Sequence, residues 1–256
     1  MENEKVSVCQ FEPVIGNIDA NIKRIEEIIN ECESSVFVFP ELCLSGYDMK
    51  SVRNNSITKE SEKFKKLIEI ARKEDCYLVV GFPESKDNKI YNSLAVISSD
   101  KVEGIYRKQY LAGNEENNIF ENGDNPLIIE TPAGKMGCLI CYDMSFPESM
   151  IEYGNKKCDF VAVISAWRNG WHDDWRLLSK ARALENNCYV ICSNQRGNQD
   201  GRFNDGESII TSPYGNIMVN LKQEKYIDTV LIDKKILKSA REYNPVPKDR
   251  QSKMNT

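Results

Sequence analysis

The stretch GCLICYDMSFPE, residues 137–148, joins an apolar run to a turn and the beginning of a helix. Residues 137–141 are apolar enough for a buried strand, and the proline and glutamate at 147 and 148 are typical of a first helical turn. Cys141 is therefore expected at the end of a strand. Functional side chains gather at strand ends in open α/β sheets, so this thiol is a candidate nucleophile.

Apolar strands and amphipathic helices alternate on both sides of that stretch. The expected helices cover residues 60–74, about 147–153, 175–185 and 234–243, besides a helix that Asp19 caps. The expected strands cover residues 6–11, 36–39, 77–82, 91–97, 102–106, 127–129, 160–164, 189–192, 207–211, 217–219 and 226–232, besides the strand that ends at Cys141. Several strands are apolar on both faces, which predicts an α/β sandwich with helices covering sheets.

The length and charge of the chain indicate a single domain that does not bind nucleic acid. The chain has 256 residues and no Pro/Gly/Ser-rich linker, charge block or repeat that would divide it. We expect a single domain over residues 1–243, followed by a polar tail, 244–256, that is disordered. The net charge is −5 and the basic residues are scattered, so nucleic acid is not an expected partner.

The nine cysteines are an odd number, and most lie in apolar runs, which is typical of a reducing compartment. No apolar run approaches the ~20 residues of a membrane span, and the N-terminus lacks the pattern of a signal peptide. We expect a soluble cytoplasmic protein with no membrane association. Cys138 and Cys141 form a Cys-x-x-Cys pair, but residues three apart in a strand point to opposite faces, so neither a metal site nor a cofactor is expected.

Three polar side chains come directly after apolar strands, namely Glu41, Lys108 and Cys141. They supply a base, a cation and a thiol, a complete set for acyl transfer in which the carboxylate takes the thiol proton and the ammonium stabilises the oxyanion. A nearby lysine would also keep Glu41 charged. The chain contains one histidine, His172, whose role the sequence leaves open, and this set does not need it.

Six regions of the chain resemble, in the same order, the motifs of the nitrilase or carbon-nitrogen hydrolase superfamily. They are FPELCLSGY (39–47), YRKQYL (106–111), EENNIFENGD (115–124), GCLICYDMSFPE (137–148), RALENNCYV (182–190), and SNQRG with GESIITSPYGNI (193–217). The matches span nearly the whole sequence, which makes the resemblance far more specific than any one of them.

This resemblance implies a four-layer α-β-β-α sandwich and a Glu-Lys-Cys triad, which corresponds here to Glu41, Lys108 and Cys141. Members of the superfamily have a second glutamate after the lysine that helps to position the substrate. The spacing within the loop assigns this glutamate to Glu116, with Glu115 as the competing alignment.

The resemblance also implies an oxyanion hole formed by Lys108 and the backbone N–H of Tyr142. Many members have a histidine two residues after the lysine, where this chain has Tyr110. The loop after the strand at 160–164 contributes to the pocket in such proteins, so Trp167 and Arg168 are expected to line it.

For the charged residues around the pocket, we expect either a structural role or an effect on the choice of substrate. Asp143 and Glu148 suit a helix start and are expected to be structural, and Arg182 is expected to shape the site from behind. If Arg168 faces the pocket, it favours a substrate with a carboxylate, such as an ω-amide of a dicarboxylic acid, whereas acids such as Asp173 there would favour an amine.

The leading hypothesis is a cysteine-dependent hydrolase that cleaves the C–N bond of a small linear amide through a thioester acyl-enzyme and releases ammonia and a carboxylic acid. The alternative within the same chemistry is an N-carbamoyl-amine hydrolase, of the carbamoylputrescine or ureidopropionate type. An alternative from a different class is a non-catalytic assembly protein, against which the complete triad argues. Since members of the superfamily commonly form dimers, a homodimer or higher homo-oligomer is expected.

Overall fold

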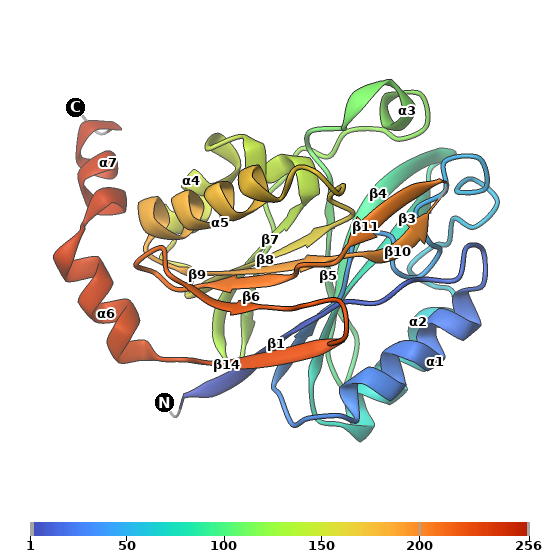
Figure 1. The fold of residues 1–256 in the computed structure, drawn as a ribbon, viewed down its shortest axis with the longest axis horizontal. Helices are drawn as coiled ribbons and strands as arrows, with labels where there is room; N and C mark the ends of the chain where they lie inside the picture. Colours follow the sequence, from blue (N-terminus) through green and yellow to red (C-terminus); the bar gives the residue numbers. More distant parts are fainter. Residues whose placement is uncertain (1–2, 200, 255–256) are drawn as a thin grey trace.

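Two six-stranded sheets pack face to face, and helices cover their outer faces (Figure 1). The computed structural model of the protein describes residues 3–199 and 201–254. The expected α-β-β-α sandwich is confirmed, and it follows from the alternation of strand-like and helix-like segments along the chain.

The first sheet has the strand order β14-β1-β2-β3-β4-β5. Its strands are β1 (Glu4–Cys9), β2 (Val36–Val38), β3 (Tyr77–Lys86), β4 (Lys89–Ile97), β5 (Val102–Arg107) and β14 (Ile227–Ile232). The second sheet has the order β13-β12-β9-β8-β7-β6. Its strands are β6 (Ile128–Thr131), β7 (Gly134–Ile140), β8 (Phe160–Ser165), β9 (Tyr189–Asn194), β12 (Ile209–Thr211) and β13 (Ile217–Asn220). The central strands of both sheets run parallel, so their carboxyl ends lie at the same edge of each sheet.

The strand sequences determine which side chains enter the core between the sheets. Because successive strand residues point to opposite faces, Val36 and Val38 of β2 belong to the core shared with the second sheet, whereas Phe37 packs with the helices α1 (Ile18–Ile29) and α2 (Glu62–Lys73). Every residue of β2, β8 and β9 is buried. This burial on both faces explains why their sequences are almost continuously apolar.

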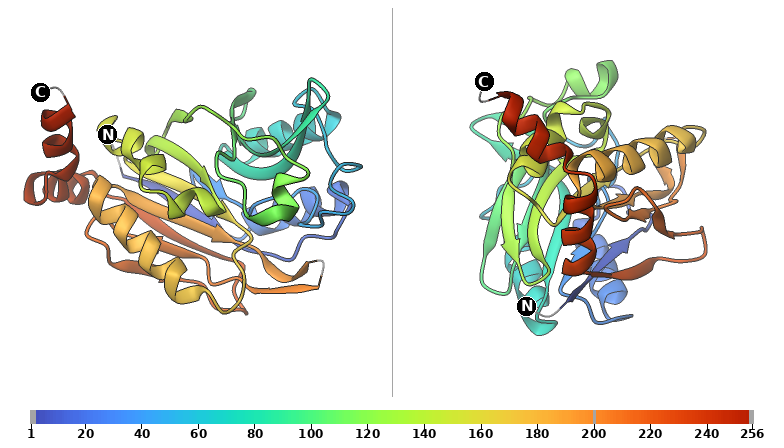
Figure 2. Two further views of the ribbon diagram at one scale, coloured as in Figure 1. Left: turned by 90° about the horizontal axis from the view of Figure 1, so that it is seen from above. Right: turned by 90° about the vertical axis from the view of Figure 1, so that its left-hand side faces the viewer.

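Helices α4 (Glu148–Asn155) and α5 (His172–Asn186) cover the second sheet, and α1 and α2 cover the first (Figures 1 and 2). The expected cap of α1 is wrong by two residues. Asn17 is the N-cap, and its Oδ1 accepts a hydrogen bond from the Ala20 N–H at 3.1 Å. Asp19 lies in the first turn and binds Lys63 and Lys66 of α2 instead.

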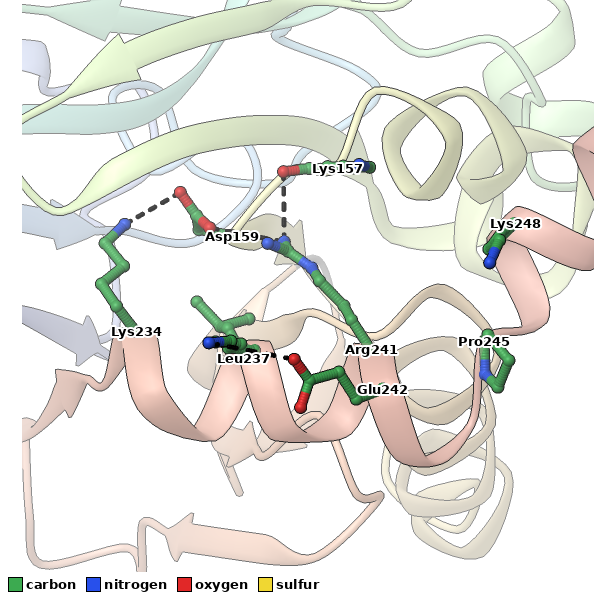
Figure 3. A pocket seen from close by; sticks show the side chains of 9 residues that line it. Lys157, Asp159, Lys234, Leu237, Arg241, Glu242, Pro245 and Lys248 are labelled. Carbon is green, nitrogen blue, oxygen red and sulfur yellow. Dashed lines mark hydrogen bonds and ion pairs between the residues drawn. The ribbon is translucent and has the colours of Figure 1, made fainter.

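The C-terminal segment forms two helices, α6 (Lys234–Tyr243) and α7 (Val246–Met254), that extend along one end of the molecule (Figures 1 and 2). Figure 3 shows how α6 is held: Lys234 binds the Asp159 carboxylate at 2.9 Å, and Arg241 donates to the Lys157 carbonyl at 3.1 Å. The expectation of a disordered tail is wrong for its described part. The Arg250 side chain of α7 donates to the Glu185 carbonyl at the end of α5, an acceptor that composition alone does not reveal.

Two short elements lie in segments where no regular structure was expected. Helix α3 (Gly113–Asn117) interrupts the polar loop after β5, and β10 (Arg196–Gln199) pairs with β11 (Arg202–Asp205) as a separate hairpin. Within the described ranges, no helix is both long enough and apolar enough to cross a membrane.

Candidate active site

The ends of three strands bring Glu41, Lys108 and Cys141 together. Glu41 follows β2 and Lys108 follows β5 in the first sheet, and the Lys108 Nζ donates to the Glu41 Oε1 at 2.8 Å. Cys141 follows β7 in the second sheet. Both Glu41 and Lys108 act on the pKa of the Cys141 thiol, which places the sulfur within electrostatic reach of the pair. The structure therefore joins Glu41 to Lys108 directly, and the convergence of all three side chains on one reacting centre stays a prediction.

Glu116 of α3 completes the buried charge cluster. Its Oε1 accepts a second hydrogen bond from the Lys108 Nζ at 2.9 Å, and its Oε2 accepts one from the Ala112 N–H at 2.7 Å. Only 1% of the Glu116 surface is exposed. Glu115 points outward and pairs with Arg202 of the hairpin. Of the two alignments left open by the sequence, the geometry favours Glu116.

Sequence reasoning missed two side chains that hold the carboxylates. The Asn92 Nδ2 on β4 donates to the Glu41 Oε1 at 2.7 Å and to the Glu116 Oε1 at 3.4 Å. The Tyr47 hydroxyl donates to the Glu116 Oε1 at 2.6 Å. An asparagine beside the apolar run 94–97 of the same strand was the available signal for Asn92, because a buried amide needs a partner.

One backbone donor and one side-chain donor, each following a strand of the second sheet, bind Glu41. The Ala166 N–H, directly after β8, donates to the Glu41 Oε2 at 2.8 Å. The Gln195 Nε2, directly after β9, donates to the Glu41 carbonyl oxygen at 2.6 Å. Glu41 is therefore fixed from both sheets, and its carboxylate orientation depends on how the sheets pack.

Cys141 begins a tight 3₁₀ turn, η1 (Cys141–Ser145), with a left-handed backbone at φ 49°. Asp143 holds this turn: its Oδ2 accepts from the Ile140 N–H at 3.0 Å, and its Oδ1 accepts from the Tyr110 N–H at 2.8 Å. Since Tyr110 lies two residues after Lys108, the Asp143 carboxylate ties the cysteine turn to the lysine strand. Asp143 is thus structural, as expected.

Arg182 supports the same turn from α5. Its Nε donates to the Met144 carbonyl at 2.9 Å and its Nη2 donates to the Ser145 carbonyl at 3.1 Å. The arginine therefore lies behind the cysteine turn, as expected, and satisfies carbonyls that the short 3₁₀ helix leaves unpaired.

Burial dominates the electrostatics of the cluster. It raises the pKa of the Cys141 thiol, and the Glu41 carboxylate raises it further. It also raises the pKa of Glu41 above its ordinary value, although Lys108 opposes this rise. Lys108 thus acts on the pKa of Glu41 in the expected direction, but burial is the larger effect and leaves this pKa above its ordinary value. For Lys108, burial alone would lower the pKa, but Glu116 and Glu41 raise it well above its ordinary value.

Cys141 opens into a cleft of about 640 Å³. The cleft is lined by Tyr47, Ala112, Gly113, Cys141, Tyr142, Ser145, Ala166, Trp167, Arg168, Trp171, Asp174, Leu177 and Leu178. The predicted pocket residues Tyr142, Trp167 and Arg168 all belong to this lining. Asp173 does not, and it pairs with Arg176 at 3.3 Å. His172 lies outside the lining too, where its Nε2 is 3.2 Å from Asp205.

Residues 5–242 match the model of the carbon-nitrogen hydrolase family. The chain belongs to this family. The structure of Nit3 from Saccharomyces cerevisiae, a member of branch 10 of the nitrilase superfamily, superimposes with a TM-score of 0.88. That chain is 28% identical, and the match covers 96% of this chain and 95% of Nit3.

Two characterised amidases are also similar over nearly their whole length. The 2-oxoglutaramate amidase of Bacillus subtilis is 28% identical over 94% of this chain and 95% of its own length. The omega-amidase NIT2-B of Xenopus laevis is 28% identical over 100% of this chain and 98% of its own length. The family and these relatives make the protein an enzyme that hydrolyses C–N bonds.

This carbon-nitrogen hydrolase offers acid-base and thiol chemistry at its cleft. Within residues 3–199 and 201–254, no group of three or more His, Cys, Asp or Glu side chains is placed to hold a metal ion. The thiol is protonated at rest because its pKa is raised, so the site needs a neighbouring base to generate the nucleophile.

Proposed function

We propose that the enzyme hydrolyses a small linear amide through a thioester on Cys141, with Glu41 as the base and Lys108 as the electrophilic cation. The observation that carries this proposal is the buried Lys108 ammonium, which is held between Glu41 and Glu116 at 2.8 and 2.9 Å. A buried cation beside a half-buried thiol suits the stabilisation of an oxyanion that forms on the acyl carbon.

In the first step, Glu41 accepts the thiol proton while the sulfur bonds to the amide carbon. Lys108 and the backbone N–H of Tyr142 stabilise the negative oxygen of the tetrahedral intermediate. The C–N bond then breaks, and Glu41 returns the proton to the leaving nitrogen. Ammonia departs, and the acyl group stays on Cys141 as a thioester.

In the second step, Glu41 accepts a proton from a water molecule that attacks the thioester carbon. The second tetrahedral intermediate collapses with loss of the thiolate, which recovers the proton from Glu41. The carboxylic acid is released and the resting thiol is restored. The hydrogen bonds from Asn92 and Ala166 hold the Glu41 carboxylate in the orientation that these steps need.

The substrate that this cleft favours is an amide with a carboxylate at its far end. Arg168 supports this assignment because it lines the cleft, and guanidinium groups bind carboxylates with matched geometry. The names of the relatives, a 2-oxoglutaramate amidase and an omega-amidase, point to the same class.

We propose a cytoplasmic location as well, supported by the nine free cysteines, which suit a reducing compartment.

The test is intact-mass analysis of the protein after rapid quenching with a panel of small amides and N-carbamoyl amines. We expect a mass increase equal to the acyl group in the wild type and none in Cys141→Ala. A carbamoyl adduct would instead identify the N-carbamoyl-amine alternative. Ammonia release that persists in Cys141→Ala would rule out the proposed nucleophile.

A matched pair of variants separates Glu116 from its neighbour. Glu116→Gln removes one carboxylate from Lys108 and should lower kcat by about 10²-fold or more, as loss of a preorganised electrostatic contact does. Glu115→Gln removes only the exposed pair with Arg202 and should leave kcat within about twofold. Equal losses in both variants would contradict the assignment of the second glutamate.

A further inference from the structure

We propose that the cleft selects amides whose far end is zwitterionic, with a carboxylate bound by Arg168 and a protonated amine bound by Asp174. This inference rests on the proposed function, since it names the substrate class of the same site. It starts from charge: of the thirteen residues that line the cleft, Arg168 and Asp174 are the charged ones.

Neither charge is used within the protein. Among the residues that the structure describes, the side chains of Arg168 and Asp174 make no hydrogen bond or ion pair, whereas the surrounding charges are paired. Asp173 binds Arg176, and Arg176 also contacts Glu207. The two unpaired groups are therefore available to a ligand, and both are solvated until one arrives.

The two groups lie on one wall of the cleft. That wall begins at Ala166, whose N–H donates to the Glu41 carboxylate, and continues through Arg168 to the first turns of α5. Trp171, Asp174 and Leu178 follow at steps of three and four residues, so one face of α5 is directed at the cleft. The amide can therefore reach Cys141 while the other end of the molecule meets the charged part of the wall.

The wall is rigid enough to place these charges. The Trp167 N–H donates to the Asn194 Oδ1 at 2.6 Å, and the Trp167 Nε1 donates to the Trp171 carbonyl at 2.9 Å. The Trp167 ring also packs on the buried Trp175 ring, with centroids 5.3 Å apart. The segment from Arg168 to Asp174 is thus held at both ends by tryptophan contacts.

Opposite charges in one cleft select by repulsion as well as by attraction. A ligand with only a carboxylate gains Arg168 but meets Asp174, and a ligand with only an amine gains Asp174 but meets Arg168. A side-chain amide of an α-amino acid satisfies both. Asp174 also interacts favourably with the helix dipole at the N-terminus of α5. Asp173 makes the same interaction without lining the cleft, so the dipole does not explain why an acid lies at position 174.

The test compares four amides that share a five-carbon chain: pentanamide, glutaramate, 4-aminopentanamide and glutamine. They carry neither charge, the carboxylate, the amine and both charges, respectively. We expect the wild-type kcat/KM for glutamine to exceed those of the other three by about tenfold, since each charged contact in a partly shielded cleft contributes about that factor.

Charge-removing variants should change this order selectively. Arg168→Gln should lower kcat/KM for glutamine and glutaramate, and Asp174→Asn should lower it for glutamine and 4-aminopentanamide while raising it for glutaramate. Pentanamide contacts neither charge, so each change is expressed as a ratio to the kcat/KM of the same variant for pentanamide. Asp173→Asn is the matched control one residue away and should leave the order unchanged.

Two outcomes are separable. The zwitterion assignment is overturned if kcat/KM for glutamine is no higher than for pentanamide. It is also overturned if the variants change kcat/KM for all four amides by the same factor. In both cases the proposed amide hydrolysis stands. If none of the four amides, pentanamide included, leaves an acyl group on Cys141, the proposed function itself fails.

Discussion

Lys108 is enclosed with two carboxylates, and this imbalance governs the chemistry of each residue in the cluster. Glu41, Lys108 and Glu116 are 0%, 1% and 1% exposed, so one cationic and two acidic side chains share a buried space. Ionising the Cys141 thiol would add a third negative charge, which the low local dielectric opposes. In the proposed mechanism, the thiol therefore gives up its proton during attack on the substrate, when Lys108 stabilises the new oxyanion.

The pH dependence of the enzyme follows from the raised pKa of Glu41. Because burial lifts this pKa above the ordinary value of 4.5, the carboxylate becomes protonated as pH falls through a higher value than an exposed glutamate would show. Protonated Glu41 cannot accept the thiol proton, so log kcat/KM should decline with a slope of about one on the acid side.

The measurement is a pH–rate profile with the circular dichroism of the protein recorded over the same range, which separates loss of the base from unfolding. An acid limb at or below the ordinary glutamate range, with the fold intact, would contradict the role of Glu41.

The positions of Glu41, Lys108 and Cys141 after strands could be predicted, because each follows an apolar run and the ends of such runs are visible in a sequence. Asn92 and Tyr47 could not be assigned in the same way. Their contacts with Glu116 depend on the register of β4 and on the path of the loop after Glu41, and both are tertiary properties. The choice between Glu115 and Glu116 also required the direction in which α3 faces.

At the scale of elements, the position of Glu41 depends on how closely β3 approaches the end of β2. A Cβ atom on Gly81 would lie 2.4 Å from the Leu42 nitrogen, 2.7 Å from the Pro40 oxygen and 2.8 Å from the Glu41 Cα. All three are backbone atoms, which cannot move aside as a side chain can. Glycine at position 81 is therefore a condition for the catalytic backbone to lie where it does.

Gly81→Ala should push the Glu41 segment away from β3 and so from Lys108. We expect a loss of about 1–3 kcal/mol in the free energy of unfolding, typical of overpacking in a core. We also expect kcat to fall by about 10²-fold, because a displacement of about 1 Å is enough to misplace a catalytic group. Chemical denaturation and steady-state kinetics measure the two effects.

Gly104→Ala is the matched control in the same sheet. Its added Cβ would meet the Leu127 Cδ1 at 2.7 Å, which is the end of a half-buried side chain that can rotate. We expect a small loss of stability and an unchanged kcat. Normal activity in Gly81→Ala would show that the Glu41 segment does not depend on this close approach.

Amphipathic elements were predictable from sequence, and elements that depend on distant acceptors were not. The apolar faces of α1 and α2 repeat at helical steps, so both helices were expected within a few residues of their ends. Helix α7 has no such face. It is held by polar contacts such as that of Arg250 with the end of α5, and the hairpin β10–β11 likewise lacks an apolar alternation.

For the whole molecule, the proposed active site lies where the two sheets meet. The first sheet supplies Glu41 and Lys108, the second supplies Cys141, and the Ala166–Glu41 hydrogen bond crosses from one to the other. Packing of the valines and isoleucines between the sheets therefore positions the catalytic groups as well as stabilising the fold. Substitutions in this shared core should affect both properties.

Helix α5 carries an exposed apolar stripe, whose first residue, Leu177, also lines the cleft. Leu177 and Leu184 are 64% and 44% exposed, and with Ala181 they repeat at steps of four and three residues. Such a stripe is costly in water, and a second copy of the chain could cover it. We therefore expect a homo-oligomer in which the α5 layers of two subunits pack together.

Leu184→Glu should weaken that assembly, because it introduces charge into the middle of the expected contact. Multi-angle light scattering should give a mass of at least twice 29.3 kDa for the wild type and a shift towards 29.3 kDa for the variant. Leu231→Glu is the control, since Leu231 is also 50% exposed but lies on β14, away from α5. A wild type that is monomeric, or equal dissociation by both variants, would show that the stripe on α5 is not the contact.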